Sequence, residues 1–173
     1  FALAACAVVG GELQLEKFPA TSWQPDASFV SLLLKMGVSC RAEGRALVIK
    51  RAERLQPLEA DLSSTPDLAP VLSVLLARAK GTSRLRGLSQ LVHKESDRMS
   101  NTQKLISRLG RVCWATPAEL VIEGSTSVFG GEGPFDPDQD HRMAMAAQIA
   151  NYGGARLTIE SPHVVEKSFP EFW

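Results

Sequence analysis

Leu33-Leu-Lys-Met-Gly-Val-Ser-Cys40 is followed, after a short polar turn, by the apolar run Leu47-Val-Ile-Lys50. The same pattern returns later in the chain as Ile106-Ser-Arg-Leu-Gly-Arg-Val-Cys113 and Leu120-Val-Ile-Glu123. Each copy predicts a helix that ends at its glycine and two short strands that follow it, because glycine adopts the left-handed conformation that closes many helices. The recurrence indicates an internal structural repeat.

A second element occurs three times and extends this repeat. An apolar helical stretch precedes each of Gly10-Gly-Glu-Leu-Gln-Leu-Glu16, Gly81-Thr-Ser-Arg-Leu-Arg86 and Gly153-Gly-Ala-Arg-Leu-Thr-Ile159, and the first glycines lie 71 and 72 residues apart. The alternation of polar and apolar residues after each glycine predicts a half-buried strand. The repeated unit is therefore strand-helix-strand-helix-strand-strand (βαβαββ).

The chain holds about two and a half such units, with expected boundaries near residues 1–51, 52–124 and 125–173. This order predicts an α/β fold in a single domain that covers residues 1–173. Because the chain starts without methionine, inside the apolar stretch Phe1–Val9, we expect a fragment that is truncated at both ends. The first unit then lacks its leading strand, which predicts an unpaired sheet edge and association or partial disorder there.

The overall composition argues against several classes of partner. Lys and Arg number 19 and Asp and Glu also number 19, so no basic field attracts nucleic acid or an anionic membrane. No apolar run reaches the length of about 18 residues that a membrane span requires. Cys6, Cys40 and Cys113 lack zinc-ligand spacing, and we expect them to be reduced, buried thiols in a cytoplasmic protein rather than to include a disulfide pair.

The segment Leu91-Val-His-Lys-Glu-Ser-Asp-Arg-Met99 is the first that suggests chemistry. We expect it to open the second helix of the middle unit, with Lys94 and Arg98 on one helix face. Cations are unfavourable at a helix start unless an anion binds there. The alternative is a solvated face on which Glu95 and Asp97 balance the charge, and the spacing alone leaves both interpretations open.

Three further segments carry candidate residues. Asp140-His-Arg-Met-Ala-Met145 predicts a helix start with Asp140 as its cap and the cation Arg142 in the first turn. Thr65-Pro-Asp67 places a carboxylate at another helix start, as capping rules favour. Lys167 reads as a surface lysine, and residues 124–139 read as a connecting loop rather than a phosphate cradle.

Taken together, these segments resemble those of the EPSP synthase (3-phosphoshikimate 1-carboxyvinyltransferase) family. The resemblance lies in Lys94-Glu-Ser-Asp-Arg98, Asp140-His-Arg-Met-Ala-Met145, Lys167-Ser-Phe-Pro-Glu-Phe172 and Thr65-Pro-Asp67. It implies two similar domains, each of three βαβαββ units with helices packed inside the sheets, of which this chain is the C-terminal part. It also implies transfer of an enolpyruvyl group from phosphoenolpyruvate to shikimate 3-phosphate in chorismate and aromatic amino acid biosynthesis. No metal or organic cofactor is implied.

The resemblance also implies roles for individual residues. Asp67 and Glu95 are the expected catalytic acid and base, Asp67 toward the attacking hydroxyl and Glu95 toward the methylene carbon. Lys94, together with Asp67, is expected to bind shikimate 3-phosphate. Three cations are expected to hold phosphoenolpyruvate: Arg98, Arg142 and Lys167.

The missing N-terminal domain of the same enzyme is an expected partner, so the chain alone is expected to be inactive. A cytoplasmic location is implied, or a plastid one for a plant protein. Gln90, Val92-His93 and Pro25 depart from the family pattern, and the Gln90 contact to shikimate 3-phosphate is therefore the least secure. Two alternatives stay open: a related transferase that acts on a UDP-sugar, and a stand-alone binding domain without catalysis.

Overall fold

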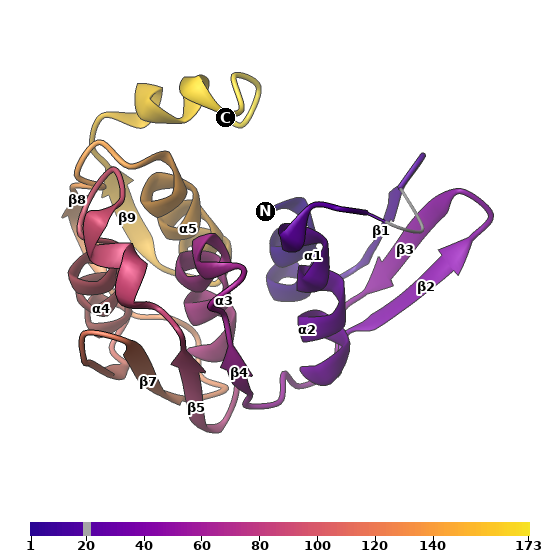
Figure 1. Cartoon of the computed structure of the whole chain (residues 1–173), viewed down its shortest axis with the longest axis horizontal. Helices are drawn as coiled ribbons and strands as arrows, with labels where there is room; N and C mark the ends of the chain where they lie inside the picture. Colours follow the sequence, from indigo (N-terminus) through magenta and orange to yellow (C-terminus); the bar gives the residue numbers. More distant parts are fainter. Residues whose placement is uncertain (19–21) are drawn as a thin grey trace.

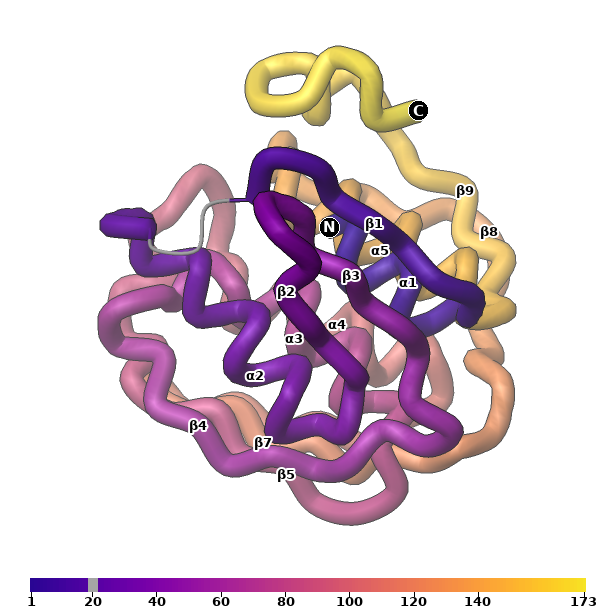
Figure 2. The backbone as a smooth tube through the Cα atoms, turned by 90° about the vertical axis from the view of Figure 1, so that its right-hand side faces the viewer, coloured from indigo at the N-terminus to yellow at the C-terminus, as the bar shows by residue number. Residues whose placement is uncertain are grey.

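The computed structural model describes residues 1–18 and 22–173, and its helices lie between three β-sheets (Figure 1). α1, α3 and α5 occupy the middle of the molecule, and the sheets lie around them (Figure 1). Figure 2 shows the same layering from the side, with the first sheet toward the viewer and these helices behind it. The α-helices are α1 (Ala2–Val9), α2 (Phe29–Lys35), α3 (Ala69–Leu76), α4 (Arg98–Arg108) and α5 (His141–Tyr152).

Three strands of the second sheet repeat the order of the first sheet, and the third sheet is a parallel pair. The first sheet has the order β1-β3-β2 and is antiparallel throughout. The second has the order β4-β5-β7-β6, in which β4 pairs with β5 in parallel and the others are antiparallel. The strands are β1 (Glu12–Leu15), β2 (Ser39–Glu43), β3 (Ala46–Lys50), β4 (Glu59–Asp61), β5 (Gly81–Arg86), β6 (Val112–Ala115), β7 (Glu119–Gly124), β8 (Glu132–Phe135) and β9 (Arg156–Ile159).

α3 is the centre of the core. All eight residues of its sequence Ala-Pro-Val-Leu-Ser-Val-Leu-Leu are buried, as expected for a helix that is apolar on all sides. It packs against α1, α4 and α5, so helices rather than strands meet in the interior. The predicted α/β class with helices inside the sheets is confirmed.

The predicted helix ends are also confirmed. Gly37 follows α2 with φ 87° and Gly110 follows α4 with φ 74°, and both then lead into a strand pair. β1 and β5 occupy equivalent places, each antiparallel to the last strand of its unit. β5 has β4 on its other side, whereas β1 has no second neighbour among the described residues, so the predicted free edge is present.

Residues 124–139 are not a loop throughout, contrary to the prediction. Glu132-Gly-Pro-Phe135 forms β8, which pairs in parallel with β9. The Gly and Pro residues favour a loop in isolation, and pairing with β9 overrides that local preference.

The prediction that Lys94 and Arg98 share a helix face is wrong. A 3-10 helix, η3 (Ser89–His93), ends before Lys94, whose backbone is extended. α4 begins only at Arg98, because the Asp97 carboxylate accepts a hydrogen bond from the Ser100 backbone N–H at 3.0 Å and caps the helix there.

Candidate active site

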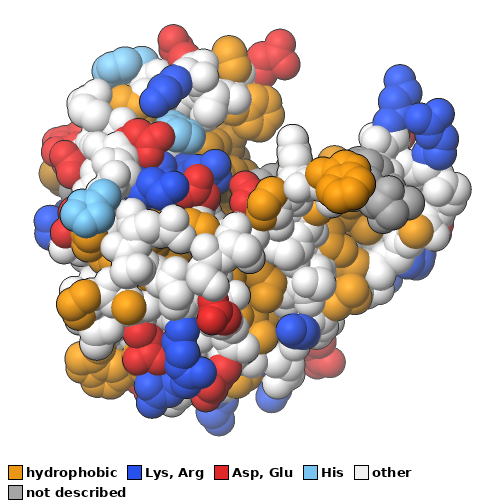
Figure 3. Space-filling view, viewed as in Figure 1, with side chains coloured by type: hydrophobic (Ala, Val, Ile, Leu, Met, Phe, Trp, Pro, Cys, Tyr) orange, Lys and Arg blue, Asp and Glu red, His pale blue; other side chains and the backbone are white. Residues whose placement is uncertain are grey.

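Five of the six predicted site residues lie at the starts of α3, α4 and α5, and the sixth is Lys167. Asp67 lies in the 3-10 helix η2 (Pro66–Leu68) before α3, Lys94 and Glu95 precede α4, and Asp140 caps α5. Helix N-termini carry partial positive charge, which favours carboxylates at these places. Basic and acidic side chains interleave in the upper part of the face in Figure 3. Ion pairs join the predicted residues into one cluster, which we call the charged cluster: Lys94–Asp67, Arg98–Asp67, Arg98–Glu95, Arg98–Asp140, Arg142–Asp67, Arg142–Asp26 and Lys167–Glu95.

Three cationic side chains contact the Asp67 carboxylate. Its Oδ1 lies 3.1 Å from Lys94 Nζ and accepts a hydrogen bond from Arg98 Nη1 at 2.8 Å. Its Oδ2 lies 3.4 Å from Arg142 Nη2. Because the Asp67 side chain is still 28% exposed, a ligand can reach this carboxylate.

Arg98 is the buried centre of the cluster, with a side chain that is 1% exposed. Its guanidinium donates to Asp140 at 2.6 and 3.2 Å, to Glu95 Oε2 at 2.6 Å and to Asp67 at 2.8 Å. In this arrangement Arg98 meets carboxylates of the chain on every side. The predicted contact of Arg98 with phosphoenolpyruvate therefore requires Asp67 or Glu95 to move.

Asp140 has a second role that its helix-cap position did not predict. Its Oδ1 accepts a hydrogen bond from the Arg142 N–H at 2.9 Å, which confirms the cap. It is fully buried, and besides Arg98 it accepts a hydrogen bond from Ser96 Oγ at 3.0 Å. Burial disfavours the Asp140 anion, but the hydrogen bonds and charge of Arg98 hold the pKa of Asp140 below its usual value.

Two pairs at the rim of the cluster are longer. Lys167 ends the 3-10 helix η4 (Pro162–Lys167), is 70% exposed, and has its Nζ 3.8 Å from Glu95 Oε1. Arg142 Nη1 lies 3.9 Å from Asp26 Oδ2, and Asp26 comes from the 3-10 helix η1 (Pro25–Ser28) at the first sheet's side. These long contacts hold the cations loosely, so Lys167 and Arg142 can turn toward a ligand.

His141, next to Asp140, is buried and not in an ion pair with any described residue. Burial is the main cause that lowers its pKa, with Arg142 and Arg98 adding to the effect while Asp140 and Glu95 oppose it. The imidazole is therefore neutral at pH 7, and it borders the cluster as an uncharged side chain.

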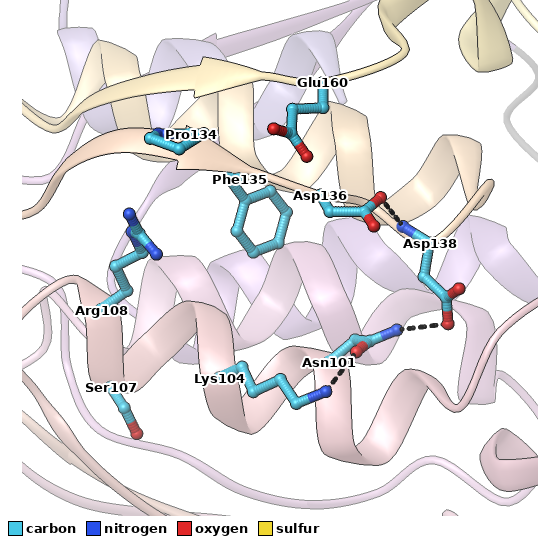
Figure 4. A pocket seen from close by; sticks show the side chains of 9 residues that line it. All are labelled: Asn101, Lys104, Ser107, Arg108, Pro134, Phe135, Asp136, Asp138 and Glu160. Atoms are coloured by element: carbon cyan, nitrogen blue, oxygen red, sulfur yellow. Dashed lines mark hydrogen bonds between the residues drawn. The ribbon is translucent and has the colours of Figure 1, made fainter.

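One cavity adjoins the charged cluster, and a second lies apart from it. One, of about 300 Å³, is lined by Arg142, Asp26 and apolar side chains that include Phe29 and Val71. Another, of about 720 Å³, lies between α4 and β8, with Lys104 among its lining residues (Figure 4). None of the predicted site residues lines this larger groove.

Within residues 1–18 and 22–173, no group of three His, Cys, Asp or Glu side chains has the placement to hold a metal ion. In the same described part of the chain, no helix combines the length and apolarity that crossing a membrane requires. The three cysteines are free thiols in the structure. Cys6 and Cys113 are buried as predicted, whereas Cys40 is only half-buried, contrary to the prediction, because it lies on the outer strand β2 of the first sheet.

Two solved structures have a similar fold. The structure resembles that of an EPSP synthase from Acinetobacter baumannii, with a TM-score of 0.79 over 97% of this chain and 42% of that one, at 24% identity. It also resembles the enolpyruvyl transferase NikO from Streptomyces tendae, with a TM-score of 0.73 over 96% of this chain and 39% of that one, at 19% identity. At these sequence identities, both similarities show a shared fold and nothing more.

The sequence comparisons are more specific. The chain is 40% identical to a 3-phosphoshikimate 1-carboxyvinyltransferase from Aeropyrum pernix over 99% of its own length and 40% of that relative's. It is 35% identical to the enzyme of the same name from Syntrophobacter fumaroxidans, over 98% of this chain and 40% of the relative. The chain therefore spans about 40% of the length of the curated relatives it matches. Because the sequence model of the family described as EPSP synthase (3-phosphoshikimate 1-carboxyvinyltransferase) matches residues 1–173, the chain belongs to the EPSP synthase family.

Proposed function

We propose that the chain supplies catalytic and substrate-binding groups for the transfer of an enolpyruvyl group from phosphoenolpyruvate to shikimate 3-phosphate. The observation that carries this proposal is the charged cluster, in which the reachable carboxylates of Asp67 and Glu95 lie among four cations. Phosphates and carboxylates of the two substrates are anions that Lys and Arg side chains recognise by hydrogen bonding. The products are 5-enolpyruvylshikimate 3-phosphate and inorganic phosphate.

The first chemical step is an addition. A hydroxyl oxygen of shikimate 3-phosphate forms a bond to C2 of phosphoenolpyruvate and loses its proton, while C3 gains a proton. In the proposed roles, Asp67 takes the hydroxyl proton and Glu95 gives a proton to C3. Asp67 fits this role because its side chain is 28% exposed, and the contact of 3.1 Å with Lys94 Nζ holds its carboxylate in position.

The second step is an elimination from the resulting ketal phosphate. C3 returns a proton to Glu95, the C–O bond to phosphate breaks, and the double bond forms again. The proton that Asp67 took from the hydroxyl goes to the departing phosphate, which leaves as HPO4²⁻, so all atoms and charges balance and both carboxyl groups return to their starting states. Lys167 and Arg142 are the proposed clamps for the phosphate that leaves and for the carboxylate of phosphoenolpyruvate. Both are rim residues, and their ion pairs with Asp26 and Glu95, at 3.9 and 3.8 Å, are the longest of the charged cluster, so these are the pairs that a ligand separates most easily.

Arg98 has a different proposed part. Because it is 1% exposed and hydrogen-bonded to both Asp67 and Glu95, it fixes the two carboxylates relative to each other. Phosphoenolpyruvate reaches Arg98 when its own carboxylate takes the place of Glu95 or Asp67. The remaining cations and the groups for shikimate 3-phosphate are proposed to come from the rest of the enzyme, outside this chain.

A chimera tests the proposal directly. This chain replaces the matching 40% of the Aeropyrum pernix relative, and phosphate release is measured with both substrates and with each alone. We expect release only with both substrates. Glu95→Gln should lower kcat by about 10² to 10⁴, the usual contribution of an acid–base group. Glu16→Gln, at an exposed glutamate outside the cluster, is the matched control and should leave kcat unchanged.

The outcomes separate the alternatives. A folded chimera that binds both substrates without phosphate release would refute the catalytic proposal and favour a binding domain. Equal kcat for Glu95→Gln and Glu16→Gln would refute the role of Glu95 alone. Because the fold is similar to another enolpyruvyl transferase, a UDP-sugar is tested as acceptor in parallel, and turnover with it in place of shikimate 3-phosphate would correct the substrate. The cytoplasmic or plastid location stays a prediction.

A further inference from the structure

A second cavity lies at the end of the core opposite the charged cluster. Asp67 precedes α3, whereas Arg78 follows its last turn, and an eight-residue helix separates them by about 12 Å. There the segment Arg51–Leu55, which connects β3 to β4, passes the C-terminal end of α1. These parts enclose a cavity of about 260 Å³ lined by Ala7, Val8, Arg51, Ala52, Glu53, Arg54, Leu55, Arg78 and Thr126.

Three arginines line this cavity, and none of them has an ionic partner in the part of the chain that the structure describes. Arg51 Nη1 donates to the Val9 carbonyl at 3.2 Å, and Arg78 Nη1 donates to the Gly153 carbonyl at 2.9 Å. No ion pair among the described residues includes Arg51, Arg54 or Arg78. Each therefore keeps donors that no group of the described chain accepts.

Three arginines and one carboxylate, Glu53, line the cavity, so its lining carries an excess of positive charge. Burial lowers the pKa of Arg78, and the neighbouring cations Arg51 and Arg111 lower it further. Arg78 and Arg111 also stack on the ring of Phe129, at 5.4 and 5.5 Å, so packing holds these cations together. A bound anion would relieve their mutual repulsion.

The backbone adds neutral donors to the same wall. The N–H groups at both ends of the connecting segment are paired, Arg51 to the Gly11 carbonyl at 3.5 Å and Gln56 to the Met36 carbonyl at 2.9 Å. Between them, the N–H groups of residues 52–55 have no acceptor among the described residues. Successive free N–H groups beside cations are a common setting for an anion.

Helix capping explains part of the arrangement but not all of it. A helix C-terminus carries about half a negative charge, and this attracts Arg51 to α1 and Arg78 to α5. Each capping arginine uses one Nη1 donor, whereas Arg54 makes no hydrogen bond and caps nothing among the described residues. Glu53, the one carboxylate that lines the cavity, is exposed.

We propose that this cavity binds a phosphate-bearing anion, of the phosphate ester or pyrophosphate class, distinct from the substrates of the charged cluster. Arginine recognises phosphate with two parallel hydrogen bonds, and the cavity offers three arginines, free N–H groups and the Thr126 hydroxyl. The anion ties the connecting segment to the ends of α1 and α3. It thereby fixes the first sheet relative to the second.

Pyrophosphate is the probe for this site, titrated into the chain at constant ionic strength. Amide NMR shifts at residues 52–55 and at Thr126 report the location, and the unfolding midpoint reports the stabilisation. We expect saturable shifts and a raised midpoint. Arg54→Gln should weaken binding by about tenfold or more, since it removes a charge-assisted contact. It should leave the fold intact because Arg54 is exposed and its side chain makes no hydrogen bond or ion pair with the described residues.

Two further variants serve as controls. Arg45→Gln removes an exposed arginine in the turn between β2 and β3 and should leave the affinity unchanged. Lys94→Gln changes the charged cluster and should also leave it unchanged, which separates this site from the proposed active site. Equal affinity for Arg54→Gln and Arg45→Gln, shifts that do not saturate, or loss of binding in Lys94→Gln would overturn the proposal.

Discussion

Replacing Asp140 by alanine is expected to destabilise the fold through Arg98 rather than through the helix cap alone. The change removes two hydrogen bonds, at 2.6 and 3.2 Å, from a guanidinium that is 1% exposed. Removing one partner of a buried ion pair costs about 3–5 kcal/mol. Because Asp67 and Glu95 still contact Arg98, we expect the lower end, about 3 kcal/mol, with about 1 kcal/mol more for the lost cap. That total is a large part of the stability of a typical domain.

Chemical denaturation of the chain measures this cost, and Asp97→Ala is the matched control. Asp97 also caps a helix, with hydrogen bonds from Ser100 N at 3.0 Å and Ser100 Oγ at 2.6 Å, but it is exposed and contacts no arginine. We expect about 1 kcal/mol for Asp97→Ala. A double variant with Arg98→Met should cost less than the two single changes together, since no cation is left unpaired. Equal costs for Asp140→Ala and Asp97→Ala would refute the reasoning.

Three other predictions concern stability and reactivity. Burial raises the pKa of Cys113 to about 12, so this thiol should react with a disulfide reagent more slowly than the half-buried Cys40 at pH 8, and the reverse order would contradict the prediction. Gly124→Ala places a Cβ in steric conflict with the Ala79 carbonyl oxygen and should cost about 3 kcal/mol, whereas Gly130→Ala, without a close neighbour, should cost much less; thermal unfolding compares the two. The pKa of His141 in the folded chain lies below its ordinary value of 6.5, so the imidazole binds a proton at a higher pH in the unfolded chain than in the folded one. The stability of the fold should therefore fall as the pH drops below about 6.5. His141→Gln should remove that dependence, and an unchanged slope between pH 7.5 and 5.5 would count against it.

The repeat could be predicted because its signals are local. A glycine that ends a helix, an apolar run and an alternating strand can each be recognised within a few residues. β8 could not, since Glu132-Gly-Pro-Phe135 has weak strand preference and becomes a strand only by pairing with β9, some twenty residues later. The pairing partner, not the segment itself, determines its structure.

The start of α4 shows the same limit on a smaller scale. The sequence interpretation began the helix before Lys94 and therefore placed this residue inside it. The structure selects Asp97, whose carboxylate reaches the Ser100 N–H. Lys94 and Arg98 nevertheless meet, because both contact Oδ1 of Asp67 rather than because they share a helix face.

The pairing of Asp140 with Arg98 had no signal in the sequence. The two residues are far apart in the chain, each is plausible alone as a helix cap or a surface cation, and one sequence does not indicate which distant side chains meet. Burial is what distinguishes them, since a charged pair at 0% and 1% exposure is retained only where each partner satisfies the other.

The charges of the cluster limit what this chain can bind alone. Four cations, Lys94, Arg98, Arg142 and Lys167, are paired with four carboxylates, Asp26, Asp67, Glu95 and Asp140. With all of them ionised, the cluster is neutral, so a multiply charged anion gains little net attraction and must first separate existing pairs. Two such substrates bound together therefore require further positive charge at this face. The proposed enzyme meets this need if segments outside this chain bring additional cations against the charged cluster.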